Sequence, residues 1–178
     1  MAYDFQKITV LIVDSQPPIV ELIQGVLHLF GVRRMITRTD GKKGLLAFEQ
    51  HRPDLLIVDW DLVSIDGLEF TRKVRQSKAN PYAPILFMTA FSSEKRVKMA
   101  RDCGVTEFLK KPFTANSLYK RIEEIVERPR KFVIAPDFFG PDRRRKKQKE
   151  TSANEKRKQT PLEIDFVDSP PDRPSGKK

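Results

Sequence analysis

Four apolar runs in the first part of the sequence end in residues that could do chemistry together. The runs cover residues 8–13, 55–58, 84–88 and 105–109, and Asp14, Asp59, Thr89 and Lys111 lie just beyond their ends. In an open α/β sheet, reactive residues gather where the carboxyl ends of parallel strands meet. Two carboxylates, a hydroxyl and an ammonium group therefore predict one assembled polar site, with Asp59 at its centre.

The segments between these runs have the spacing of amphipathic helices. From Pro17 to Phe30, apolar residues recur at three- and four-residue intervals, which is typical of a helix with one buried face. Further helices are expected over residues 40–51, 66–74, 93–103 and 114–125, and a weaker strand over 33–38. Five strand–helix units in succession predict a parallel sheet with helices on both faces.

The composition indicates one ordinary domain with additional segments, since the chain has 178 residues and is 39% apolar. No apolar run approaches the roughly 20 residues of a membrane span. The N-terminal residues do not have the pattern of a secretory signal, so a cytoplasmic location is expected. The single Cys103 excludes an internal disulfide framework and agrees with a reducing compartment.

The positive charge is concentrated after residue 127. Residues 1–127 contain 19 Lys and Arg against 16 Asp and Glu, a net +3, whereas residues 128–178 contain 15 against 8, a net +7. We therefore divide the chain into a domain at 6–127 and a basic tail at 128–178, which is expected to be mostly disordered and to contain no second sheet. Its run Arg143–Lys147 could bind nucleic acid or an acidic membrane, or could simply keep the chain soluble.

Four motifs around the predicted strand ends resemble the receiver domain of bacterial two-component response regulators. They are LIVDS (11–15), LLIVDWDLVSIDG (55–67), ILFMTAF (85–91) and FLKKPF (108–113). The resemblance covers residues 6–127 and implies a flavodoxin-like, doubly wound sheet of five parallel strands in the order 2-1-3-4-5, with five helices. It implies a phosphorylation-activated signalling switch and not an enzyme.

On this resemblance, Asp59 is the phosphoacceptor, and its partner is a histidine kinase or a phosphotransfer protein. Mg²⁺ would be held by Asp14, Asp59 and the backbone carbonyl of Asp61, because carboxylate and carbonyl oxygens are its preferred ligands. Lys111 and Thr89 would contact the phosphoryl oxygens. Thr89 would also act with Phe108 as the switch pair. The isomer of the Lys111–Pro112 peptide bond is left open.

The resemblance also implies an output by protein–protein contact through the fourth helix, fifth strand and fifth helix. That surface would include Lys95, Lys98, Arg101, Val105, Glu107, Tyr119 and Lys120.

The sequence departs from the family pattern at Ser15, where receivers normally carry a second acid that contacts the metal. A hydroxyl is a poorer Mg²⁺ ligand than a carboxylate, so weaker metal binding is expected. We hypothesise that the Asp61 carboxylate partly compensates, through a metal-bound water. The alternative is a pseudo-receiver that binds partners without phosphorylation. Phe91 is expected to hinder water and lengthen the phosphorylated lifetime.

Overall fold

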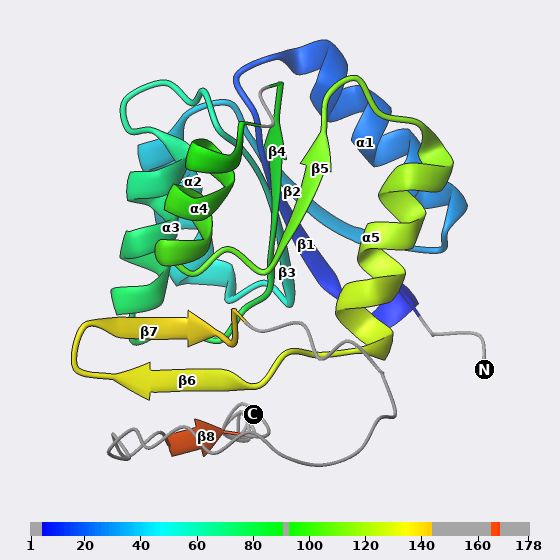
Figure 1. Cartoon of the computed structure of the whole chain (residues 1–178). Helices are drawn as coiled ribbons and strands as arrows, with labels where there is room; N and C mark the ends of the chain where they lie inside the picture. The colour runs from blue at the N-terminus through cyan, green and yellow to red at the C-terminus, as the bar shows by residue number, and fades with distance from the viewer. Residues whose placement is uncertain (1–4, 91–92, 144–164, 168–178) are drawn as a thin grey trace.

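The computed structural model of the chain describes residues 5–90, 93–143 and 165–167. Its main body is a five-stranded parallel sheet in the order β2-β1-β3-β4-β5 (Figure 1), as predicted. The strands are β1 Thr9–Val13, β2 Arg34–Arg38, β3 Leu55–Asp59, β4 Ile85–Thr89 and β5 Glu107–Lys110. Every residue of β3 and β4 is buried, which explains their continuous apolar sequences, because helices cover both faces of the sheet.

Five helices follow the five strands, after a short 3₁₀ turn at Phe5–Lys7. They are α1 Pro17–Leu29, α2 Gly41–His51, α3 Gly67–Gln76, α4 Glu94–Asp102 and α5 Ala115–Glu127. In Figure 1, α1 and α5 lie on one side of the sheet and α2, α3 and α4 on the other, so the core has two layers. Side chains of Asp40, Asp66, Ser93 and Thr114 accept backbone N–H groups at the starts of the last four helices and fix where they begin.

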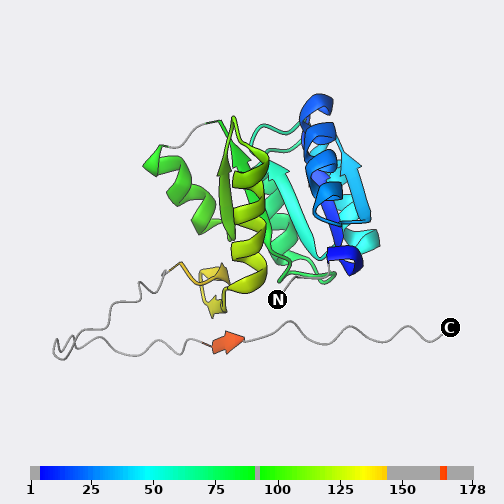
Figure 2. The same cartoon turned by 90° about the vertical axis from the view of Figure 1, so that its right-hand side faces the viewer.

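A second, smaller sheet follows α5, so the expectation that the tail contains no second sheet is wrong. Strands β6 Phe132–Ala135 and β7 Phe138–Pro141 form an antiparallel hairpin, and β8 Asp165–Val167 pairs with the other edge of β6. Figures 1 and 2 both show the hairpin at the amino-terminal edge of the main sheet, opposite the tips of the strand arrows. Apart from β8, the predicted tail after Arg143 lies outside the described residues.

No helix in the described part of the chain is both long enough and apolar enough to cross a membrane.

Candidate functional site

Three of the predicted site residues meet at the carboxyl edge of the sheet. The ammonium nitrogen Nζ of Lys111 lies 2.7 Å from Oδ2 of Asp14 and 2.8 Å from Oδ1 of Asp59. Asp14 is completely buried and Asp59 is 3% exposed. The meeting follows from the topology, because β1 and β3 are neighbours and Asp14 and Asp59 lie at the ends of these strands. One cation thus joins two largely buried carboxylates.

The backbone around β4 and β5 delivers Lys111 to this position. Thr89 pairs with Lys110 in the strand register, and the Lys111 backbone N–H donates to the Thr89 carbonyl at 2.9 Å. The peptide bond between Lys111 and Pro112 is cis. Thr89 is 3% exposed and ends the strand next to β3. Thr89 and Lys111 are therefore held side by side at the same sheet edge as Asp59.

Burial and ion pairing shift the pKa values of Asp14 and Lys111. Burial raises the pKa of the Asp14 carboxyl, although hydrogen bonds from Lys111 and from the Gln16 backbone N–H oppose that effect. Burial alone would lower the pKa of Lys111, but hydrogen bonds and charge from Asp14 and Asp59 outweigh it, so its pKa is raised. Lys111 is therefore a cation throughout the neutral pH range.

Ser15 contacts the backbone carbonyl that the sequence suggested as a metal ligand. Its hydroxyl donates to the Asp61 carbonyl oxygen at 3.1 Å. Among the residues that the structure describes, no group of three or more His, Cys, Asp or Glu residues is arranged to hold a metal ion. The oxygens of Asp14, Asp59 and the Asp61 carbonyl nevertheless suit Mg²⁺, which commonly binds proteins through one or two carboxylates and keeps several waters. These oxygens are therefore a suitable donor set for Mg²⁺. The set has one carboxylate fewer than it would have with an acid at position 15.

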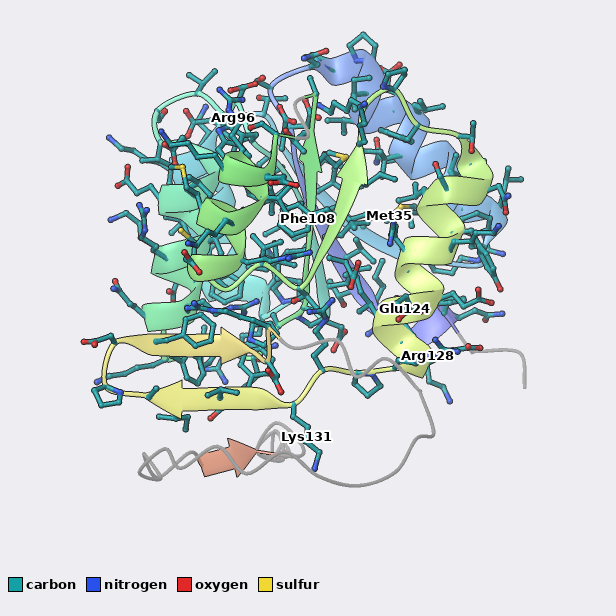
Figure 3. The ribbon with its side chains drawn as sticks, viewed as in Figure 1. Met35, Arg96, Phe108, Glu124, Arg128 and Lys131 are labelled. Carbon is teal, nitrogen blue, oxygen red and sulfur yellow. The ribbon has the colours of Figure 1, made fainter. Side chains whose placement is uncertain are left out.

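Phe108 lies further down β5 and is only partly buried. Its ring packs edge-on against Phe87 of β4, with 6.3 Å between the ring centroids, and Figure 3 shows it in the middle of the sheet. The ring therefore lies between the core and the surface, on the strand that leads to Lys111. Phe91 lies outside the described residues.

Two contacts at the mouth of the site were not predicted from the sequence. The guanidinium carbon of Arg96 in α4 lies 5.0 Å from the centroid of the Trp60 ring, and Trp60 packs edge-on against Phe87. The Asp40 carboxylate, which caps α2, also accepts a hydrogen bond from the Ser64 hydroxyl in the loop after β3. Both contacts join segments that are far apart in the sequence, so no local pattern could have revealed them.

Comparisons with known proteins agree with this geometry. The family model of the response regulator receiver domain matches residues 10–123. The transcriptional regulatory protein TrcR of Mycobacterium tuberculosis is 33% identical over 70% of this chain and 48% of its own length. This chain thus spans about half the length of that regulator. The chemotaxis protein CheY of Pseudomonas aeruginosa is 30% identical over 67% of this chain and 96% of its own length.

Solved structures show the same fold. A putative response regulator from Chloroflexus aurantiacus has a TM-score of 0.64 and 30% identity, and the match covers 68% of this chain and 98% of that one. The receiver domain of a sensor histidine kinase from Pseudomonas aeruginosa, solved with a magnesium ion coordinated in its active site cleft, has a TM-score of 0.60 and 26% identity. That match covers 66% of this chain and 94% of that one. Family match, topology and site together show that this chain belongs to the response regulator receiver domains of two-component signalling.

Proposed function

We propose that this receiver is a phosphorylation-activated switch and that Asp59 accepts the phosphoryl group. The observation that carries the proposal is the pairing of Asp59 with Lys111, 2.8 Å away, at the carboxyl edge of the sheet. An Asp59 carboxylate oxygen bonds to phosphorus while the phosphorus–nitrogen bond of a partner's phosphohistidine breaks. The electron pair of that bond leaves with the imidazole nitrogen. Catalysis of such a transfer consists mainly of positioning and charge stabilisation.

The neighbours of Asp59 supply those two contributions. Lys111 remains protonated, orients the acceptor carboxylate and then neutralises a phosphoryl oxygen. The Thr89 hydroxyl donates a hydrogen bond to a second phosphoryl oxygen. Asp14, Asp59 and the Asp61 carbonyl would hold Mg²⁺, which would supply positive charge to stabilise the phosphoryl oxygens. Phe108 and Thr89 then relay the change toward the surface.

The output surface lies on α4, β5 and α5, and it binds a protein partner after phosphorylation. Lys95, Lys98, Arg101 and Lys120 are exposed there, so the partner that fits this surface is acidic. The expectation that Val105 and Glu107 belong to this surface is wrong. Val105 is 4% exposed and Glu107 is 2% exposed, so neither is available to a partner. The kinase or phosphotransfer protein approaches the carboxyl edge of the sheet, where Asp59 ends β3 and Asp14 lies just before the start of α1.

The test is phosphorylation of the full chain by a small acyl phosphate in the presence of Mg²⁺. We expect wild type to gain the mass of one phosphoryl group and Asp59→Asn to gain none. Asp61→Asn is the matched control, since it also removes one acid at the mouth of the site but leaves the acceptor intact. Modification of Asp59→Asn, or none in wild type, would contradict the proposal.

The second candidate is a pseudo-receiver, and one observation favours it. Ser15 replaces an acid and donates to the Asp61 carbonyl, while Lys111 already forms ion pairs with both remaining carboxylates. In that case the chain binds its partner equally well with and without the phosphodonor. Comparing partner affinity between wild type and Asp59→Asn under phosphorylating conditions separates the two functions.

A further inference from the structure

The β6–β7 hairpin is fixed to the receiver by an aromatic cluster. Phe132 of β6 and Phe139 of β7 pack against Tyr82, from the loop before β4, with ring centroids 5.1 and 5.3 Å from the Tyr82 ring. The Arg75 guanidinium, at the end of α3, lies 5.1 Å from the Phe132 ring centroid. Arg75 is itself held by the carbonyls of Gly104, Pro81 and Ala83. The hairpin is therefore packed on a rigid part of the domain.

Polar contacts fix both ends of the same hairpin. Before β6, Arg130 reaches the buried carboxylate of Glu107 in β5 at 2.6 Å. After β7, Arg143 pairs with Asp102 of α4 at 2.8 Å and lies over the Phe138 ring. Because these contacts hold the hairpin from two directions, the orientation of its outer edge is set by the receiver.

That outer edge belongs to β6. The strand order β7-β6-β8 places β6 between its hairpin partner and β8, and Figure 1 shows β8 on the side away from the receiver. The pairing with β8 is antiparallel and joins Phe132 with Val167, Val133 with Phe166 and Ile134 with Asp165. A strand edge presents a row of backbone N–H and C=O groups, which is a template for an added strand.

The sequence around β8 independently has the pattern of a strand. In residues 162–166 the apolar Leu162, Ile164 and Phe166 alternate with Glu163 and Asp165, a period of two. This acidic stretch lies in a tail that is otherwise strongly basic, since residues 144–164 contain eight Lys and Arg against three acids. Lys131, which immediately precedes β6, is exposed and points away from the receiver (Figure 3). Edge and segment are therefore matched in backbone geometry.

β8 occupies the free edge of β6 in this structure, and we propose that this edge is a strand-addition site whose resident ligand is the chain's own segment around Asp165–Val167. In the sequence, the basic residues 144–164 separate this segment from the end of the hairpin. A long connection between β7 and β8 adds little to the cost of pairing β8 with β6, because the entropic cost of loop closure grows slowly with loop length. The ligand class is an extended segment in which apolar and acidic residues alternate.

Hydrogen exchange of the full chain tests the proposal through the amides of β6. Neighbouring residues of a strand point their N–H groups to opposite edges, so one of Phe166 and Val167 donates toward β6. Proline has no N–H, and the double variant Phe166→Pro, Val167→Pro therefore blocks the pairing. We expect about tenfold faster exchange of those β6 amides that do not bond to β7. The matched control Thr151→Pro, Ser152→Pro places two prolines in the connecting segment and should leave exchange at the wild-type rate.

Adding a synthetic peptide of residues 161–169 to the double proline variant should restore the protection of β6, and a scrambled peptide should not. Equal exchange in wild type and the double variant would overturn the proposal, as would failure of the peptide to restore protection. Protection that grows with protein concentration would also overturn it, because β8 would then come from a second copy of the chain.

Discussion

At the scale of single residues, the site consists of one cation that forms ion pairs with two carboxylates. Lys111 contacts Asp14 and Asp59 at nearly equal distances, and both carboxylates are largely buried. A metal ion that enters must share or replace the contacts of Lys111, and it finds no third carboxylate at Ser15 to help. The number of charged ligands is one of the properties that set the affinity of a site for a hard cation. We therefore expect the residue at position 15 to have a large effect on Mg²⁺ affinity.

Replacing Ser15 with Asp should strengthen Mg²⁺ binding about tenfold, because the site gains a third negative ligand. Trp60 provides the measurement, since it is the only tryptophan in the chain, follows Asp59 directly and is 8% exposed. Titrating Mg²⁺ while recording its fluorescence gives the dissociation constants of wild type and Ser15→Asp.

Two variants show whether charge causes the change. Ser15→Ala frees the Asp61 carbonyl without adding charge and should bind Mg²⁺ with near wild-type affinity. Asp61→Asn should bind it more weakly, if the exposed Asp61 carboxylate compensates for Ser15. An affinity for Ser15→Ala that equals that of Ser15→Asp would show that freeing the carbonyl, and not charge, matters; equal affinities in wild type and Asp61→Asn would exclude compensation.

Asp14→Asn should stabilise the protein at neutral pH. Folding raises the pKa of Asp14, so the folded state binds its proton more tightly than the unfolded chain does. The ionised carboxylate therefore lowers stability at pH 7, and this penalty disappears as the pH falls through the raised pKa toward the ordinary value of 3.8. Urea unfolding at about pH 7 and about pH 5 should show an advantage of the variant that shrinks on acidification. An advantage that grows on acidification would contradict the assignment.

At the scale of elements, the main sheet was predictable because local patterns decide it. Apolar runs formed the strands, and the residues Asp40, Asp66 and Thr114 began helices as their types suggest. The hairpin was not predictable, because Phe132 and Phe139 are buried by Tyr82 and Arg75, which come from distant elements. Its short strands have no core of their own.

The candidate site also has a part that the sequence predicts and a part that it does not. Asp14, Asp59, Thr89 and Lys111 could be placed together because each follows a strand, and parallel strands end at one edge. The hydrogen bond from Ser15 to the Asp61 carbonyl depends instead on the path of a loop, and the stacking of Arg96 on Trp60 depends on how α4 packs. Neither loop path nor helix packing can be read from residue spacing.

A buried ion pair connects the last strand of the sheet with the hairpin. The Glu107 side chain is 3% exposed and pairs with Arg130 at 2.6 Å and, more loosely, with Arg121 at 3.4 Å. Arg130→Met should lower the free energy of unfolding by about 2 kcal/mol, because a buried carboxylate loses its closer partner. Urea denaturation measures this difference.

The matched control for that prediction is Arg128→Met. Arg128 pairs with Glu124 one helical turn away, and both side chains are exposed (Figure 3). Such a pair contributes little, so the variant should change the free energy of unfolding by less than about 0.5 kcal/mol. Equal losses in the two variants would mean that the Glu107 pairing does not hold the hairpin.

At the scale of the whole molecule, α4 and the turn after it connect the carboxyl edge of the main sheet with the hairpin. Arg96 in the first half of α4 stacks on Trp60 beside Asp59, the proposed phosphoacceptor, while Asp102 at its end pairs with Arg143 after the hairpin. Gly104 in the turn approaches Gly140 so closely that a Cβ on Gly140 would lie 2.9 Å from the Gly104 Cα. A displacement of α4 on phosphorylation would therefore be felt at the hairpin as well as at the site.

The hairpin also decides where the receiver ends as a stable unit. A chain ending at residue 127 loses Phe132 and Phe139 and leaves Tyr82 uncovered, so it should unfold with a free energy at least about 2 kcal/mol below that of the full chain. A chain ending at residue 143 keeps the hairpin and the Arg143–Asp102 pair, and should stay within about 1 kcal/mol of the full chain. Urea denaturation of the three chains measures both differences. Equal stability of the two shortened chains would show that the hairpin rests on the receiver without stabilising it, and the domain would then end at α5.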